Sequence, residues 1–316
     1  MIESNQKTPQ DNPNPFDDRI DLRELFQVLW KGAIVIILIT SAVAISSIVY
    51  SLQLTNYYQS ESILLVRNNA QNQGTLSQYS GVASMIGVSL PTSGVEKVNE
   101  AIELIQSRRF VKHLITFENI LPSIMAAESY DSVSNKLYFN SNIFDSETNT
   151  WQGEPNEKGI IKPSYLEAHR AYGGLISVSQ DKMTGFISIK VEHISPVFAK
   201  DFLELIIQEA NTLLRNRDMQ ESNQALQYLK IELSKTSYVE IRDSINSLIE
   251  AQLETQMLAK INKEYSLAKI EPPFIPDQKS KPIRSIIVII ATFFGGVLSV
   301  MTVLVRHYFF RGRQQT

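Results

Sequence analysis

The chain has 316 residues, a formal net charge of −3 and no cysteine. A charge this close to zero argues against a nucleic-acid-binding protein, which usually carries a strong basic excess. The absence of cysteine excludes disulfides, thiolate metal sites and cysteine nucleophiles.

The N-terminal region contains a first apolar segment. Residues 1–18 are rich in Asn, Gln, Pro and Asp, a composition typical of disorder, and an uncharged apolar run covers 32–52. At ~1.5 Å per residue, a helix of this length spans about 30 Å, the hydrocarbon thickness of a bilayer. Because a long, partly acidic leader precedes it, the run does not look like a signal peptide. We therefore predict an N-terminal segment over 1–31 and an uncleaved transmembrane helix over 32–52.

A second uncharged run covers 285–305 and predicts a second transmembrane helix, followed by a tail over 306–316. Two spans place both chain ends on one side. The positive-inside rule makes that side the cytoplasm, since basic residues flank the spans there: Arg19, Arg23, Lys31, Arg306, Arg311 and Arg313. The basic residues at 279, 281 and 284 oppose this orientation, but long loops translocate largely regardless of charge. We expect a bacterial inner-membrane protein with cytoplasmic termini and a periplasmic domain over 53–284.

The middle of the chain begins with mixed secondary structure. Residues 57–66 alternate and predict a strand, and 95–121 have helical spacing of apolar residues. Residues 141–163 hold Gly and Pro among polar residues and suggest an irregular insert. Residues 175–180 and 185–192 flank a turn and predict a β-hairpin that forms a small sheet with the first strand.

A long helix is predicted next. Ser195 suits an N-cap and Pro196 the first helical position, and neither Pro nor Gly occurs from there to Lys269. The spacing predicts a helix over about 196–269, with a break at 236–238 left open. Such an element is either extended and coiled-coil-like or a helical hairpin. Pro272-Pro273 then ends helical structure.

Four segments in this order resemble the Wzz-type polysaccharide co-polymerases, the chain-length determinants of bacterial surface polysaccharides. They are 20–34, 181–192 with Ser195-Pro196, 225–268 and 272–296. The resemblance implies a membrane-proximal α/β domain with a long projecting helix, and ring-like homo-oligomers that work with a Wzy-type polymerase. One departure is that Lys281-Pro282-Ile283-Arg284 stands where the family commonly has Pro-Lys-Arg.

No catalytic constellation is visible in the sequence. The four histidines, at 113, 169, 193 and 307, lack metal-ligand spacing, and neither a phosphate loop nor a nucleophile elbow occurs. Only eleven residues follow Val305, so we expect no attached kinase of the kind found in related capsule systems. We predict a non-enzyme without cofactor or metal.

Two residue clusters are candidates for contacts. Ala291, Gly295 and Ser299 are four apart and share one face of the second span, where small residues let helices approach closely in lipid. This face is expected to pack against the first span, a neighbouring subunit or the polymerase. Arg108, Arg109 and Lys112 form a basic cluster, more typical of a solvated helix face than of an anion site.

The expected function is regulation of surface polysaccharide length by an oligomeric scaffold. Lipopolysaccharide O-antigen is the first expectation because no kinase is attached, and enterobacterial-type common antigen is the alternative. The expected partners are further copies of the chain, a Wzy-type polymerase, the polysaccharide or its lipid-linked precursor, and membrane lipid, but no nucleic acid. The alternative is a periplasmic adaptor or export component. A two-span sensor is disfavoured because no cytoplasmic signalling module is visible.

Overall fold

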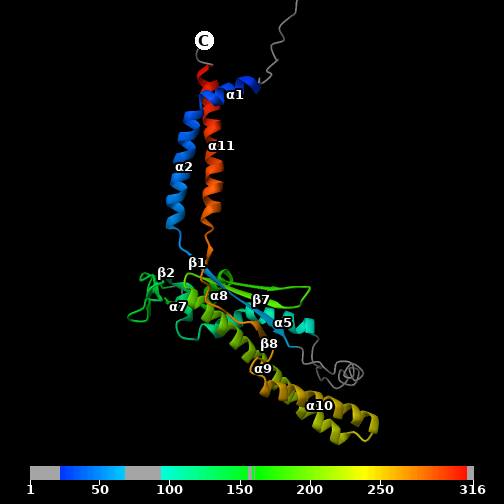
Figure 1. Cartoon of the computed structure of the whole chain (residues 1–316). Coiled ribbons are helices and arrows are strands. Elements are labelled where there is room, and N and C mark those ends of the chain that lie inside the picture. The colour runs from blue at the N-terminus through cyan, green and yellow to red at the C-terminus, as the bar shows by residue number, and fades with distance from the viewer. Residues whose placement is uncertain (1–21, 68–93, 156–158, 160, 312–316) are drawn as a thin grey trace, which may run out of the picture. The chain divides into compact units, whose positions relative to one another are not determined.

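The computed structural model describes residues 22–67, 94–155, 159 and 161–311. The chain divides into two compact units (Figure 1). One comprises Met1–Leu54 with Ile283–Thr316, and the other comprises Thr55–Pro282.

The first unit contains the two long apolar helices, α2 (Ala33–Gln53) and α11 (Arg284–Arg311), with the short α1 (Leu22–Lys31). By length and composition, α2 and the segment Arg284–His307 of α11 are able to cross a membrane. The two helices pack side by side (Figure 1). The prediction of one long apolar helix near each end of an α/β domain is confirmed, although α11 extends past the predicted 285–305 at both ends.

The second unit is built on an antiparallel sheet in the order β6-β7-β1-β8, with β9 also paired to β1. The strands are β1 (Tyr57–Val66), β6 (Ile176–Gln180), β7 (Ile187–His193), β8 (Leu267–Glu271) and β9 (Lys279–Lys281). The predicted strand at 57–66 and the predicted β-hairpin are confirmed. Tyr58 lies opposite His193, and Val178 lies opposite Ile189.

Helix α9 (Pro196–Lys235) supplies the core on this sheet. The Ser195 hydroxyl accepts the amide of Phe198 and Pro196 opens the helix, as the sequence predicts. The first half of α9 buries its apolar stripe against β1 and β7, including Ala199, Phe202, Leu203, Ile206, Ile207 and Ala210. The core is completed by the helices α5 (Gly94–Gln106), α6 (Arg108–Leu114), α7 (Ile120–Met125) and α8 (Tyr165–Leu175).

The predicted helix over about 196–269 is two helices and a strand. The break left open at 236–238 occurs: α9 ends at Lys235, and α10 (Val239–Ile261) folds back along its distal half (Figure 1). A small cluster of Leu229, Ile245 and Leu248 closes the helical hairpin.

The prediction that this helix continues to 269 is wrong, because residues 267–271 form β8. Residues 262–269 resemble the helix before them in composition, but β1 offers an open edge there, and Leu65 pairs with Ala268. The side chain of Asn211 on α9 fixes the returning chain. Its oxygen accepts the amides of Ser266 (2.9 Å) and Leu267 (2.8 Å), and its nitrogen donates to the carbonyl of Leu267 (3.0 Å). Tertiary contacts therefore override local helix propensity.

Two small hairpins lie between α7 and α8, and only the second falls within the predicted irregular insert over 141–163. Strand β2 (Ala127–Asp131) pairs with β3 (Lys136–Phe139), and β4 (Phe144–Asp145) pairs with β5 (Thr150–Trp151). The sequence predicts only irregular structure over 141–163, because strands of two residues leave no periodic pattern.

Candidate functional site

The predicted small-residue face of α11 meets α2 at two of its three positions. A Cβ atom added to Gly295 would lie 2.9 Å from the Cβ of Val43, and Ser299 is fully buried. The Ser299 hydroxyl lies 3.3 Å from the hydroxyl of Thr40. Ala291 is half-buried. Of the three predicted packing residues, Gly295 and Ser299 therefore lie at the contact between the two apolar helices, which requires small side chains.

A further contact residue was missed by the sequence reasoning. A Cβ added to Gly32 would lie 2.5 Å from Cγ1 of Val303. This glycine therefore packs against the C-terminal half of α11. Gly32 stands between α1 and α2, and an isolated glycine at a helix junction is usually read as a break. On α2, the residues that meet α11 give no distinct signal in an apolar run.

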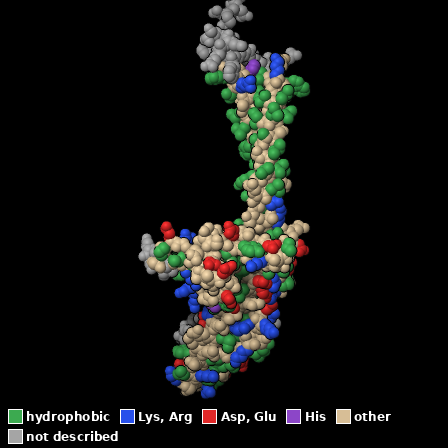
Figure 2. All heavy atoms as spheres, turned by 90° about the vertical axis from the view of Figure 1, so that its left-hand side faces the viewer, with side chains coloured by type: hydrophobic (Ala, Val, Ile, Leu, Met, Phe, Trp, Pro, Cys, Tyr) green, Lys and Arg blue, Asp and Glu red, His purple; other side chains and the backbone are tan. Residues whose placement is uncertain are grey.

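The outer surface of this helix pair is almost entirely apolar (Figure 2). Exposed side chains include Ile34, Ile37, Leu38, Ile45, Ile289, Phe293, Leu298 and Met301. In water these residues would remain unburied, whereas hydrocarbon accepts them without cost. A groove between the helices also presents Thr40, Ser41, Thr292 and Gly296 among the apolar residues.

The chain segments that adjoin the two apolar helices are joined within the second unit. Tyr57 at the start of β1 is the register partner of Lys281 at the end of β9. The proline-rich segment before β9 is held on β1 by two buried serines, since Ser60 donates to the carbonyl of Phe274 (2.7 Å) and Ser62 to that of Glu271 (2.6 Å). Lys281 also pairs with Glu192 at 2.6 Å.

The histidines have structural partners rather than metal-site geometry. His193 is buried, and its Nδ1 accepts the amide of Ser195 while its Nε2 lies 3.0 Å from the carbonyl of Ser123. Burial lowers the pKa of His193 to about 4. His113 lies 2.6 Å from Glu209, and His169 lies 2.9 Å from the carbonyl of Gln106. Within the described parts of the chain, no group of three or more His, Cys, Asp or Glu is placed to hold a metal ion.

The basic cluster of the sequence lies on the outer face of α6. Arg108 and Arg109 are exposed, and the Lys112 amine lies 5.6 Å from the centre of the Tyr165 ring. This arrangement is that of a solvated helix face with one cation–π contact.

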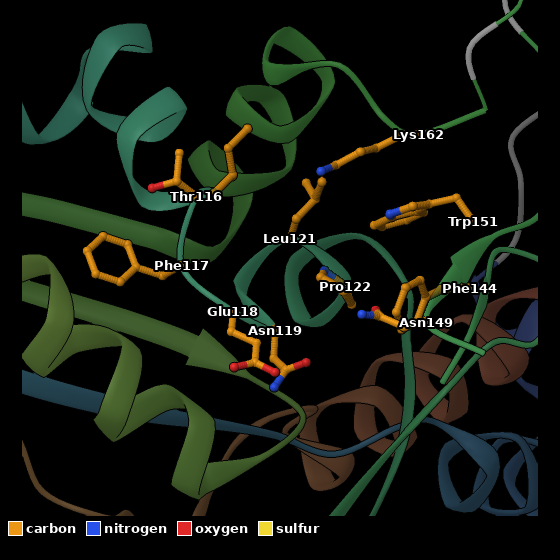
Figure 3. Close-up of a pocket in the computed structure, with 11 residues that line it drawn as sticks. Thr116, Phe117, Glu118, Asn119, Leu121, Pro122, Phe144, Asn149, Trp151 and Lys162 are labelled. Carbon is orange, nitrogen blue, oxygen red and sulfur yellow. The ribbon is translucent and has the colours of Figure 1, made fainter. Parts of the chain in front are cut away.

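A small pocket lies beside α7 (Figure 3). It is formed by residues 115–119 between α6 and α7, the start of α7, the β4–β5 hairpin and Lys162. It combines aromatic rings with amide and charged groups, including Phe144, Trp151, Asn119, Asn149, Glu118 and Lys162. Sequence reasoning did not identify it, because three separate segments of the chain contribute.

Residues 18–117 match the family model described as chain length determinant protein (Wzz). This match confirms the family resemblance found in the sequence. That family consists of non-catalytic chain-length regulators, in agreement with the prediction of a non-enzyme. No curated protein matches the chain by sequence.

The solved structures that are similar to the chain include two polysaccharide co-polymerases. The first is a full-length bacterial polysaccharide co-polymerase, with 12% identity, a TM-score of 0.42, and coverage of 92% of this chain and 99% of that one. The second is a fragment of WzzB, the polysaccharide co-polymerase from Salmonella Typhimurium, with 13% identity, a TM-score of 0.28, and coverage of 72% and 100%. Sequence identity is low in both cases.

Proposed function

We propose that this chain, which belongs to the chain length determinant family through residues 18–117, regulates the length of a bacterial surface polysaccharide from the inner membrane. The family match is the observation that carries the proposal. Two helices apolar enough to span a bilayer, flanking one large α/β unit, support it.

In the proposed topology, α2 and α11 cross the inner membrane, both chain ends lie in the cytoplasm and residues 53–284 form the periplasmic domain. Basic residues occur at the cytoplasmic ends of both helices, at Lys31 and Arg306. The apolar surface of the helix pair supports this placement (Figure 2), because only lipid or another apolar surface would cover it.

The proposed working form is a ring-like homo-oligomer. The helical hairpin of α9 and α10 exposes large apolar side chains along its length: Tyr228, Ile231, Val239, Leu253, Met257 and Ile261. An exposed apolar surface of this kind on an otherwise polar domain is typical of a protein–protein contact. A second copy of the chain, carrying the same surface, is the occupant that the family resemblance favours.

Within the membrane, the proposed partner is a Wzy-type polymerase. The groove between α2 and α11 offers Thr40, Ser41, Thr292 and Gly296, residue types that pack closely or hydrogen-bond between membrane helices. The proposed polysaccharide is lipopolysaccharide O-antigen. The protein would contact either the growing polysaccharide or its lipid-linked precursor. The scaffold would limit extension through the size of the oligomer or through contacts with the glycan, without chemistry of its own.

The test is deletion of the gene in its host, followed by gel separation of the extracted surface polysaccharide. We expect the clustered lengths to collapse into a smoothly declining ladder. An unchanged cluster would contradict the proposal, and complete loss of polysaccharide would favour an export component instead.

A further inference from the structure

The pocket beside α7 has a volume of about 200 Å³, enough for a single sugar ring but not for a large ligand. Figure 3 shows the Trp151 indole and the Lys162 side chain directed toward Leu121 and Pro122, with Asn149 next to Phe144. The floor is apolar, since Leu121, Pro122 and Phe144 are buried. Polar side chains surround this floor.

The aromatic wall of the pocket is fixed in place. Phe144 is 3% exposed, and its ring centre lies 5.0 Å from that of Trp151 and 5.6 Å from that of Phe139. Phe144 and Trp151 are also register partners in the β4–β5 hairpin. The half-buried indole is therefore presented in one orientation, which reduces the entropy that a ligand must overcome on binding.

The turn of the β4–β5 hairpin is braced in the same way. The carboxylate of Asp145 accepts the amide of Glu147 (2.9 Å) and the hydroxyl of Thr148 (2.7 Å). These hydrogen bonds hold the pKa of Asp145 below its usual value. Asn149, four residues after Asp145, has a left-handed backbone (φ 54°). This conformation positions its side chain at the pocket.

Four polar side chains on the rim have no bond to another described residue. Glu118, Asn119, Asn149 and Lys162 make no side-chain hydrogen bond or ion pair with any other residue that the structure describes. Asn119 also has a left-handed backbone (φ 62°), at the start of α7, and its side chain does not cap that helix. Among the described residues, two amides, one carboxylate and one amine at this pocket are thus not committed to other side chains.

We propose that this pocket binds one sugar ring of a polysaccharide chain. An indole face packs against the C–H face of a pyranose, and amide, carboxylate and amine groups match hydroxyls that both donate and accept. A phosphate ligand fits less well, because Glu118 opposes the single cation Lys162. The inference rests on the proposed function, which brings a glycan to this chain, and it adds the place of contact.

The experiment uses the only other tryptophan of the chain, Trp30, which is replaced (Trp30→Phe) so that Trp151 alone reports emission. The purified full-length variant is held in detergent micelles. It is titrated with the surface polysaccharide of the host, which mild acid has released from its lipid. We expect a saturable change in the emission of Trp151. Adding Asn119→Gly and Asn149→Gly, which keep the left-handed backbone but remove both amides, should weaken the apparent affinity at least about tenfold.

Asn135→Gly is the matched control. Asn135 also has a left-handed backbone (φ 52°), but it lies in the β2–β3 turn outside the pocket, so its replacement should leave the titration unchanged. An emission that does not respond to the polysaccharide, or equal affinities for the pocket variant and the control, would overturn the inference. The proposed function is judged separately by the gene deletion. If the gene deletion abolishes the length cluster but the polysaccharide does not change the emission of Trp151, only the proposed sugar site is contradicted.

Discussion

Lys281 is the register partner of Tyr57, so the strand that follows the first apolar helix in the chain pairs with the strand that precedes the second. Side-chain bonds reinforce this arrangement, because the buried hydroxyls of Ser60 and Ser62 donate to the carbonyls of Phe274 and Glu271. The proline-rich connector is thus part of the sheet and not a loose tether.

The double change Ser60→Ala and Ser62→Ala should lower the free energy of unfolding by about 1–3 kcal/mol, because the hydrogen bonds from two buried hydroxyls are lost. Thermal unfolding of the purified full chain, followed by circular dichroism, measures the loss. Lys281→Ala serves as the comparison. Its side chain is largely exposed and its ion pair with Glu192 should contribute less than about 1 kcal/mol. Equal losses in the two variants would contradict the role given to the serines.

The contact between α2 and α11 can be tested by cross-linking, since the chain has no cysteine of its own. Thr40→Cys with Ser299→Cys should form a disulfide in high yield, because the two hydroxyls are 3.3 Å apart. Adding Gly295→Leu should abolish most of it, as the new side chain would meet Val43. Linked peptides are quantified by mass spectrometry.

Gly296→Leu is the matched control for that experiment, because a Cβ at Gly296 meets no atom within 4 Å. It should leave the yield of the disulfide unchanged. If both leucine variants reduce the yield to the same extent, hydrophobic volume in general would be responsible and the close approach at Gly295 would be refuted.

Asn211 should be essential for holding β8, the strand that follows the helical hairpin. Asn211→Leu should cost about 3 kcal/mol or more of unfolding free energy, because the amides of Ser266 and Leu267 lose a buried acceptor. Hydrogen exchange at β8 should accelerate before that of the remaining sheet. Thr212→Ala, on the exposed side of the same helix, should change neither quantity. Protection at β8 that survives in Asn211→Leu would show that strand pairing alone holds it.

The stability of the domain should depend on pH through His193. Its folded pKa of about 4 lies below the ordinary value of 6.5, so the unfolded chain takes up a proton that the folded chain excludes. Stability from this group is complete above pH 6.5 and falls by about 3 kcal/mol as the pH drops toward 4. Denaturant unfolding at pH 7 and pH 4.5 measures it.

His193→Gln keeps a donor for the carbonyl of Ser123 and an acceptor for the amide of Ser195 but does not titrate. This variant should lose less stability between the two pH values than the natural chain. The same loss in both would mean that other groups govern the acid sensitivity.

The sequence predicts those elements whose pattern is local. Strand β1 is predicted over its observed range because residues 57–66 alternate, and α9 starts where Ser195 and Pro196 indicate. The start of β8 is not predictable in this way, since its residues continue the composition of α10 and become a strand only through β1 and Asn211. Likewise, Gly295 and Ser299 are visible from their spacing, whereas the pocket at Trp151 joins segments that only the fold brings together.

The length distribution of surface polysaccharide in cells is the direct test of whether this chain sets polysaccharide length. Surface polysaccharide is compared in the host, in the gene deletion and in the deletion carrying the restored gene, with band intensities quantified along the gel. We expect a cluster of lengths in the first and third strains and a smoothly declining ladder in the second. The same cluster in all three strains would contradict it.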